Sequence, residues 1–125
     1  MTIKTGDRLP KTNFVTPGES GLEQVDSDEF FKGRKVALFS VPGAFTPTCS
    51  ARHLPGYVDK AAELKAKGVD EIACTAVNDA FVLGAWSKSA DADGKVTMLA
   101  DGNGAFAKAI GLEMDGSKFG LGTRG

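Results

Sequence analysis

The feature that most constrains the fold is a strand-like run that passes through a tight turn into a helix. Residues 35–41 contain the apolar run VALFSV, and the Gly and Pro residues around its end predict a turn. Thr46 is a good helix N-cap, and Pro47 suits the first helical position, where its missing N–H is not needed. Cys49 then falls in the first turn of the expected helix.

The position of Cys49 predicts a reactive thiol. Unpaired backbone N–H groups and the helix dipole favour an anion at the N-terminus of a helix. A thiol there ionises more readily than a free cysteine, and the thiolate is the nucleophilic form. We therefore expect Cys49 to be a nucleophile rather than a buried structural cysteine, although cysteine is among the most buried residue types.

Strand and helix signals alternate along the rest of the chain. The expected strands lie around residues 13–15 and at 35–41, 72–77 and 96–100. The expected helices lie at 26–31, ended by Gly33, from the cysteine turn to 67 with a kink or interruption at Pro55, after a cap at 78–79, and at 105–110. This alternation predicts an α/β protein with a parallel-sheet core.

Size and charge predict one domain, residues 1–125, in a reducing compartment. The 15 Lys and Arg nearly balance the 16 Asp and Glu, so nothing indicates binding to nucleic acid or to an anionic membrane. No apolar run approaches the ~20 residues of a membrane span, and the polar start is not a secretory signal. Two cysteines do not make a disulfide framework, so we expect a cytoplasmic location.

The ten residues at 41–50, VPGAFTPTCS, resemble the active-site segment of peroxiredoxins of the peroxiredoxin-5-like (type II) subfamily. The likeness covers nearly the whole chain, in the right order, through the segments HLPG at 53–56, KAKGV at 65–69, VNDAFV at 77–82 and LAD at 99–101. It implies a thioredoxin-like fold in its peroxiredoxin variant, a three-layer arrangement in which helices flank the sheet.

The sequence departs from this family at its end. In the family, a stretch like residues 120–124 is followed by a second, catalytic arginine, two antiparallel strands and a helix, whereas this sequence stops at Gly125. Arg124 matches the arginine before the catalytic one. The resemblance therefore implies that the C-terminal hairpin and helix are absent. We expect the tail, residues 112–125, to be disordered or rearranged, or the exposed edge of the strand at 35–41 to pair with another subunit.

The resemblance implies a thiol-specific peroxidase that reduces hydrogen peroxide and alkyl hydroperoxides. Cys49 would be the peroxidatic cysteine, oxidised to sulfenic acid; the Thr46 hydroxyl would be oriented toward thiolate and peroxide, and Pro42 would shield the thiolate. An external thiol, either glutathione with glutaredoxin or thioredoxin, would regenerate Cys49 in a homodimer that needs no cofactor or metal. Thr46 can also be an ordinary N-cap, since both roles can coexist, and a Pro42 that only forms the turn would look the same in the sequence.

The alternative function is a peroxide-responsive interaction module, a truncated peroxiredoxin with little turnover that associates through its open strand edge. A thioredoxin-type disulfide oxidoreductase is disfavoured because the sequence has no C-x-x-C motif.

Other candidate residues have simpler interpretations. His53 is the only histidine, and its spacing from Cys49 would allow a catalytic pair or a metal site, but we expect a structural role. Cys74 is expected to be a small buried residue rather than a resolving cysteine, and Arg52 a solvated surface residue. The aromatic residues are ambiguous between the core and a dimer contact; they are Phe45, Phe81 and Trp86.

Overall fold

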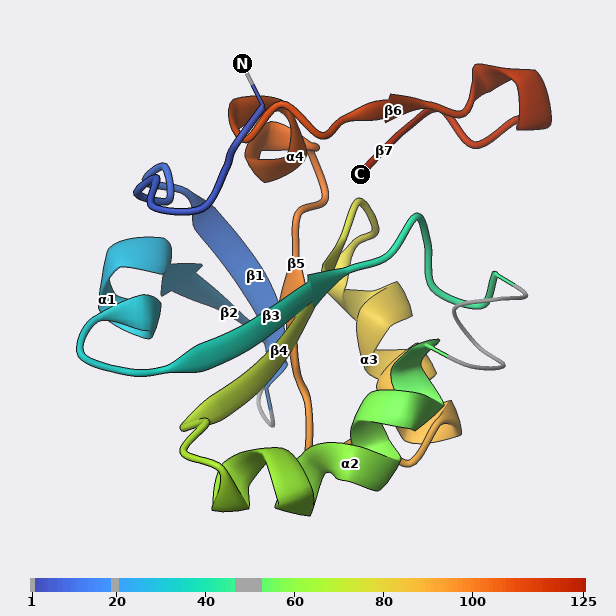
Figure 1. The fold of residues 1–125 in the computed structure, drawn as a ribbon. Coiled ribbons are helices and arrows are strands. Elements are labelled where there is room, and N and C mark those ends of the chain that lie inside the picture. The colour runs from blue at the N-terminus through green and yellow to red at the C-terminus, as the bar shows by residue number, and fades with distance from the viewer. Residues whose placement is uncertain (1, 19–20, 47–52) are drawn as a thin grey trace.

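The computed structural model describes residues 2–18, 21–46 and 53–125, which form a five-stranded sheet with helices on both faces and a short second sheet (Figure 1). The strand order in the main sheet is β2-β1-β5-β4-β3. In chain order the elements are β1 (Asn13–Gly18), β2 (Gly21–Asp26), α1 (Ser27–Phe31), β3 (Val36–Ser40), α2 (Leu54–Ala66), β4 (Glu71–Ala76), α3 (Ala80–Ser89), β5 (Thr97–Ala100), α4 (Ala105–Ala109), β6 (Met114–Asp115), η2 (Ser117–Phe119) and β7 (Thr123–Arg124).

Strands β3, β4 and β5 form the parallel part of the sheet. Phe39 of β3 lies opposite Cys74 of β4, which in turn lies opposite Met98 of β5. Strand β1 joins β5 in antiparallel orientation where Val15 faces Ala100, and β2 pairs with β1 as an antiparallel hairpin. The predicted parallel core is therefore confirmed, with an antiparallel hairpin added at one edge.

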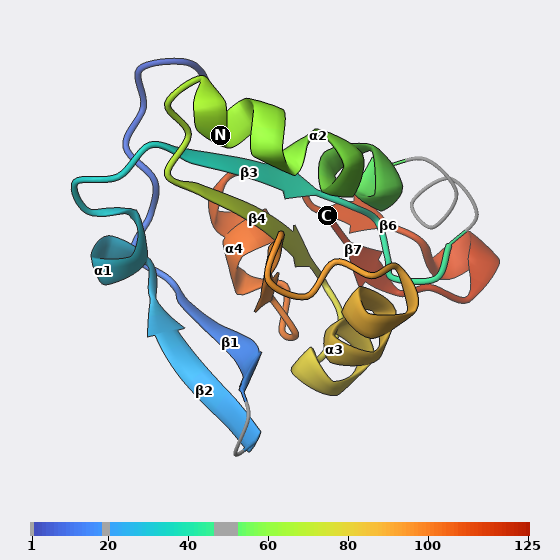
Figure 2. The same cartoon turned by 90° about the horizontal axis from the view of Figure 1, so that it is seen from below.

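Each face of the sheet buries its own hydrophobic core, because successive residues of a strand point to opposite faces. On one face, Ile72 of β4 joins a cluster with Leu54 of α2 and Trp86 of α3. On the other, the next residue, Ala73, joins a cluster with Phe106 of α4, onto which residues of α1 also pack. Figure 2 shows α2 running alongside β3. The expected three-layer thioredoxin-like arrangement is confirmed.

Aspartates cap the starts of two helices, α1 and α3, as the sequence suggests. The side chain of Asp26 accepts a hydrogen bond from the N–H of Asp28 at the start of α1, and Asp79 accepts one from Val82 at the start of α3. Such N-caps satisfy backbone donors that have no partner inside the helix. The helices expected at 26–31 and 105–110 are thus confirmed as α1 and α4, and the expected cap before α3 is confirmed at Asp79.

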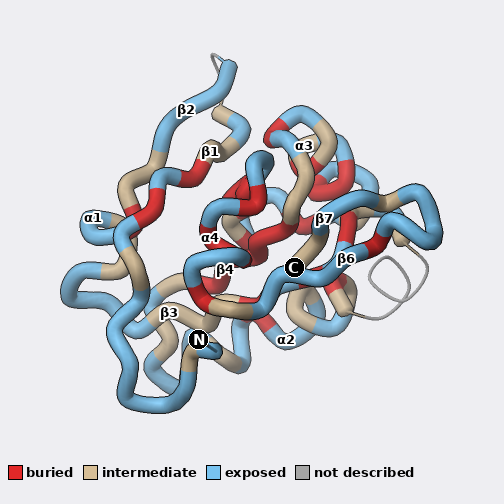
Figure 3. The backbone as a smooth tube through the Cα atoms, turned by 90° about the horizontal axis from the view of Figure 1, so that it is seen from above, coloured by how far each residue is buried: buried red, intermediate tan, exposed pale blue. Residues whose placement is uncertain are grey.

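The sequence prediction missed strand β2. Residues 21–26 are mostly exposed, since β2 is an edge strand with a partner on one side only (Figure 3). Its sequence therefore lacks the apolar alternation of a half-buried strand. Pro55 occupies the first turn of α2, where proline is tolerated. The kink or interruption expected at Pro55 concerns a helix that would begin outside the described residues, so it stays a prediction. The expected helix start at Thr46 and Pro47 extends outside the described residues.

The tail forms a small hairpin of its own. Strands β6 and β7 are antiparallel, with Met114 opposite Arg124, and the carboxylate of Asp115 accepts hydrogen bonds from the hydroxyl and the N–H of Ser117. These two bonds lower the pKa of the Asp115 carboxyl. Within the described residues, β3 pairs only with β4 and forms an edge of the sheet. Disorder of the tail and pairing of this edge with another subunit stay predictions.

Among the described residues, none of the helices has the length and apolar character that crossing a membrane requires.

Asp101 is a buried aspartate that holds the start of α4. It is 5% exposed, and its two carboxylate oxygens accept hydrogen bonds of 2.9 Å each from the N–H groups of Phe106 and Ala107. We expect Asp101→Ala to lower the free energy of unfolding by about 2–4 kcal/mol, because two buried donors lose a charged acceptor. The exposed cap variant Asp79→Ala is the control, with an expected loss of about 1 kcal/mol. Urea denaturation measures both; equal losses would contradict this assignment.

Candidate functional site

The candidate site is built on the loop that leaves the carboxyl end of β3. Beyond β3, the N–H of Val41 donates to the carbonyl of Thr75 at 3.1 Å and so extends the pairing with β4 by one residue. Ligands of open α/β sheets bind at the carboxyl ends of the strands. The following residues, 42–46, are the site loop; they include Pro42, which is exposed, and Gly43, which is buried.

The site loop contains a residue in an unfavourable backbone conformation. Phe45 has φ of 61°, in the left-handed region that residues other than glycine rarely occupy. Its side chain is 53% exposed, so burial of the ring does not account for this conformation. Such strain costs on the order of 1–3 kcal/mol and is concentrated at functional sites, which supports a functional role for this loop.

Thr46 closes the site loop on itself. Its hydroxyl donates to the carbonyl oxygen of Gly43 at 2.7 Å. Because a threonine hydroxyl has one proton, Oγ1 can act only as an acceptor toward any further partner. Cys49, with Thr48 and Arg52, lies outside the described residues, so the predicted roles of Cys49, Thr46 and Pro42 stay predictions.

Asn78 holds the site loop from the neighbouring strand connection. Its Oδ1 accepts a hydrogen bond of 2.8 Å from the N–H of Ala44. The sequence suggests a helix cap at residues 78–79, but only Asp79 caps α3. Asparagine between a strand and a helix is ordinary, and the sequence carries no signal that its amide would reach a loop on the adjacent strand.

Arg124 reaches the same loop from the tail. Its Nη1 donates to the carbonyl of Val77 at 2.9 Å, and its Nε donates to the carbonyl of Leu121 at 3.0 Å. A Cβ atom built on Gly43 would lie 3.3 Å from Nη1, so the guanidinium is packed against the turn. The structure thus brings together four residues: Gly43, Thr46, Asn78 and Arg124. From the sequence, only Gly43 and Thr46 were expected to lie together, because both belong to the segment 41–50.

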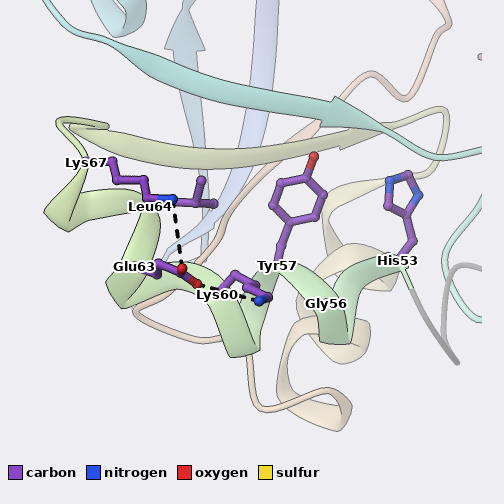
Figure 4. A pocket seen from close by; sticks show the side chains of 7 residues that line it. All are labelled: His53, Gly56, Tyr57, Lys60, Glu63, Leu64 and Lys67. Carbon is purple, nitrogen blue, oxygen red and sulfur yellow. Dashed lines mark ion pairs between the residues drawn. The ribbon is translucent and has the colours of Figure 1, made fainter.

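An aromatic cluster and a groove lie beside the site, along α2. The rings of Phe39 and Tyr57 stack with centroids 3.9 Å apart, and the His53 ring lies 5.0 Å from that of Phe39. A groove of about 660 Å³ runs past His53 and Tyr57 toward Leu64 (Figure 4). Its rim carries charged side chains, Lys60, Glu63 and Lys67. These ring contacts support the structural interpretation of His53.

Cys74 lies in the interior of β4 and is fully buried. The prediction that Cys74 is a small buried residue is therefore confirmed. Among the described residues, no group of three or more His, Cys, Asp or Glu side chains is placed to hold a metal ion.

Comparison with protein families and curated proteins identifies close relatives. The Redoxin family model matches residues 4–125. The chain is 55% identical to Peroxiredoxin-2B of Arabidopsis thaliana, over 98% of this chain and 76% of that protein. It is 52% identical to the chloroplastic Peroxiredoxin-2E-2 of Oryza sativa subsp. japonica, over 98% of this chain and 57% of that protein. The chain therefore spans between about half and three quarters of the length of these relatives.

Similar solved structures are peroxiredoxins as well. The crystal structure of reduced Prx3 from Vibrio vulnificus in complex with H₂O₂ superposes with a TM-score of 0.94 at 50% identity, covering 98% of this chain and 77% of that one. Peroxiredoxin 5 from Alvinella pompejana superposes with a TM-score of 0.87 at 41% identity, covering 98% and 77%.

The predicted cytoplasmic location is wrong. Peroxiredoxin-2E-2 of rice and Peroxiredoxin-2E of Arabidopsis, which is 46% identical, are both named as chloroplastic. Both names give a plastid location for those two proteins. Charge balance and cysteine count could not reveal it, because neither property distinguishes one reducing compartment from another.

The contact between Asn78 and Ala44 yields a test of the site loop. We expect Asn78→Ala to slow the alkylation of Cys49 by iodoacetamide at pH 7 by roughly tenfold, because the loop that leads to the thiol loses its anchor. Peptide mass spectrometry assigns the alkylated cysteine. Asn103→Ala, at an exposed asparagine, is the matched control and should react at the wild-type rate. Wild-type reactivity in Asn78→Ala would show that this anchor is not needed.

Proposed function

Because the chain belongs to the Redoxin family and, within it, to the peroxiredoxins of the peroxiredoxin-5-like type, we propose that it is a thiol peroxidase acting on hydrogen peroxide and alkyl hydroperoxides. The observation that carries the proposal is the site loop: the segment that resembles the peroxiredoxin active site leaves the carboxyl end of β3, is held by Asn78 and contains a strained residue. The Vibrio vulnificus relative was crystallised with H₂O₂, the substrate proposed for this chain.

The proposed reaction begins with the thiolate of Cys49. Its sulfur attacks one peroxide oxygen and the O–O bond breaks, giving cysteine sulfenic acid and an alkoxide or hydroxide that takes up a proton. The products are an alcohol from an alkyl hydroperoxide and water from hydrogen peroxide. Positive backbone N–H dipoles at a helix start would stabilise the negative charge on sulfur and oxygen during this step.

Thr46 would orient the peroxide. Since its proton is donated to the carbonyl of Gly43, Oγ1 has only lone pairs to offer. It would therefore accept a hydrogen bond from the O–H of the peroxide and align the O–O bond with the attacking sulfur. Pro42, at the start of the site loop, would limit access of water and excess oxidant to the thiolate.

We propose that the cycle uses one cysteine of this chain. Cys74 is fully buried within β4, which is a poor position from which to attack a sulfenic acid at another site. An external thiol would condense with the Cys49 sulfenic acid, forming a mixed disulfide and water, and a second thiol would release Cys49 by exchange. Glutathione with glutaredoxin, or thioredoxin, would supply these thiols.

Exposed aromatic rings support a homodimer. Phe45 is 53% exposed and Phe81, in the first turn of α3, is 72% exposed. Aromatic residues are enriched at protein interfaces. Trp86, the third aromatic residue considered, is 1% exposed and belongs to the core. We propose a plastid-type location, in keeping with the chloroplastic relatives.

A second candidate function is a peroxide-responsive interaction module with little turnover. The observation that favours it is the edge position of β3, whose apolar sequence VALF has a strand partner on one side only among the described residues. Unpaired edges of this kind recruit further strands. Oxidation of Cys49 without repeated turnover would favour this function.

The one-cysteine cycle predicts different outcomes for the two cysteines. We expect Cys49→Ser to abolish peroxide consumption, because a serine hydroxyl is not ionised at neutral pH, and Cys74→Ala to retain it. Consumption is measured with glutathione and glutaredoxin, and separately with thioredoxin. Loss of turnover in a folded Cys74→Ala variant would exclude the one-cysteine cycle. A single oxidation of the wild-type protein without turnover would support the interaction module.

The proposed role of Thr46 predicts a dependence on its hydroxyl group. Thr46→Val keeps the shape of the side chain but removes the acceptor, so we expect the rate constant for oxidation by peroxide to fall by roughly ten- to a hundredfold. Thr46→Ser keeps the hydroxyl and should stay within about threefold of wild type. Stopped-flow measurement of Cys49 oxidation tests this. If the valine and serine variants were equally impaired, the methyl group would be the important part of Thr46.

A further inference from the structure

We propose that Arg124 is a positioning residue for the site loop, one that clamps the turn at Gly43 through the end of β4. The expected effect of Arg124 on peroxide turnover rests on the proposed function. The hydrogen bonds of Arg124 and its contact with the turn do not depend on that function. Arg124 touches neither substrate nor the reacting sulfur in this proposal. It acts through the backbone segments that hold the loop.

The clamp depends on the fork of the guanidinium group. Nη1 donates a hydrogen bond to the carbonyl of Val77, directly after β4. Nε donates a second one to the carbonyl of Leu121, in the turn before β7. Val77 immediately precedes Asn78, whose amide oxygen holds Ala44 of the site loop. Arg124 therefore fixes the backbone from which the second anchor of the loop projects.

Gly43 shows how closely the clamp approaches the loop. A Cβ atom at this position would lie 3.3 Å from Nη1 of Arg124 and 3.3 Å from Cγ2 of Thr46. Both distances are shorter than an ordinary van der Waals contact, so a side chain at Gly43 would push the guanidinium or the Thr46 methyl group away. A larger residue at position 43 would therefore displace one of these two neighbours.

The charge of Arg124 is not neutralised within the part of the chain that the structure describes. The ion pairs there join Arg34 to Glu71, and both Lys60 and Lys67 to Glu63, and Arg124 is not among them. Its two hydrogen bonds go to neutral carbonyl oxygens. Arginine suits this role because its planar fork can bind two acceptors at once, whereas the single ammonium of lysine lacks that geometry.

The experiment uses Arg124→Met and Arg124→Lys, with Arg34→Met as the matched control. Arg34 also donates two hydrogen bonds to a backbone carbonyl, that of Phe30, and additionally pairs with Glu71, but it lies before β3. The first measurement is the rate and pH dependence of Cys49 alkylation by iodoacetamide, which does not require peroxidase activity. The second is peroxide turnover with glutathione and glutaredoxin, and urea denaturation reports stability.

We expect Arg124→Met and Arg124→Lys both to slow Cys49 alkylation by roughly tenfold, because lysine restores the charge but not the fork. Arg34→Met should alkylate at the wild-type rate even if its stability falls. Full rescue by lysine, or alkylation of Arg124→Met at the rate of Arg34→Met, would overturn the clamp. A wild-type protein that fails to turn over peroxide, with slowed alkylation in Arg124→Met, would refute the proposed function and leave the clamp standing.

A double-mutant cycle with Gly43 provides a second test. Gly43→Ala should slow alkylation strongly in the wild-type background and less in the Arg124→Ala background, where the guanidinium no longer crowds the added methyl group. Purely additive effects of the two substitutions on the alkylation rate would overturn the proposed contact between Arg124 and the turn.

Discussion

The parallel pairing of β3 with β4 is the interaction on which the candidate site depends. It runs from Val36 opposite Glu71 to Ser40 opposite Thr75, and the bond from Val41 to Thr75 carries it one residue further. Parallel strands end at the same edge of the sheet, so the loops that follow them emerge side by side. The bond from the N–H of Ala44 to the amide oxygen of Asn78 joins the two loops that this pairing brings together, and Arg124 adds a contact from the tail to Val77 at the end of β4.

The two cores explain why this frame is rigid. Alternate residues of β4 serve opposite faces, so each strand of the parallel part is held by helices above and below it. Phe39 contributes to one core and also stacks on Tyr57. The strand that leads into the site loop is thereby fixed on its α2 side, although it forms an edge of the sheet. In α/β proteins, packed strands commonly form the scaffold, and the loops at their ends carry the functional residues.

The sequence predicted what depends on local pattern and composition. Apolar runs located the parallel strands, and Asp79 was recognised as a cap because its bond to Val82 spans three residues. Strand β2 was missed because its exposed residues carry no apolar periodicity. The roles of Asn78 and Arg124 could not be predicted, since their bonds span 34 and 47 residues and depend on how separate elements meet in space. The family likeness supplied candidate residues but not the contacts that hold them.

The contact between Arg124 and Val77 also bears on the order of events in folding. A bond that closes 47 residues of chain has a larger loop-closure entropy to overcome than the turns and caps that form within a few residues. Cys49 precedes Arg124 in the chain, so a partly synthesised chain that already carries the thiol still lacks this support of the site loop.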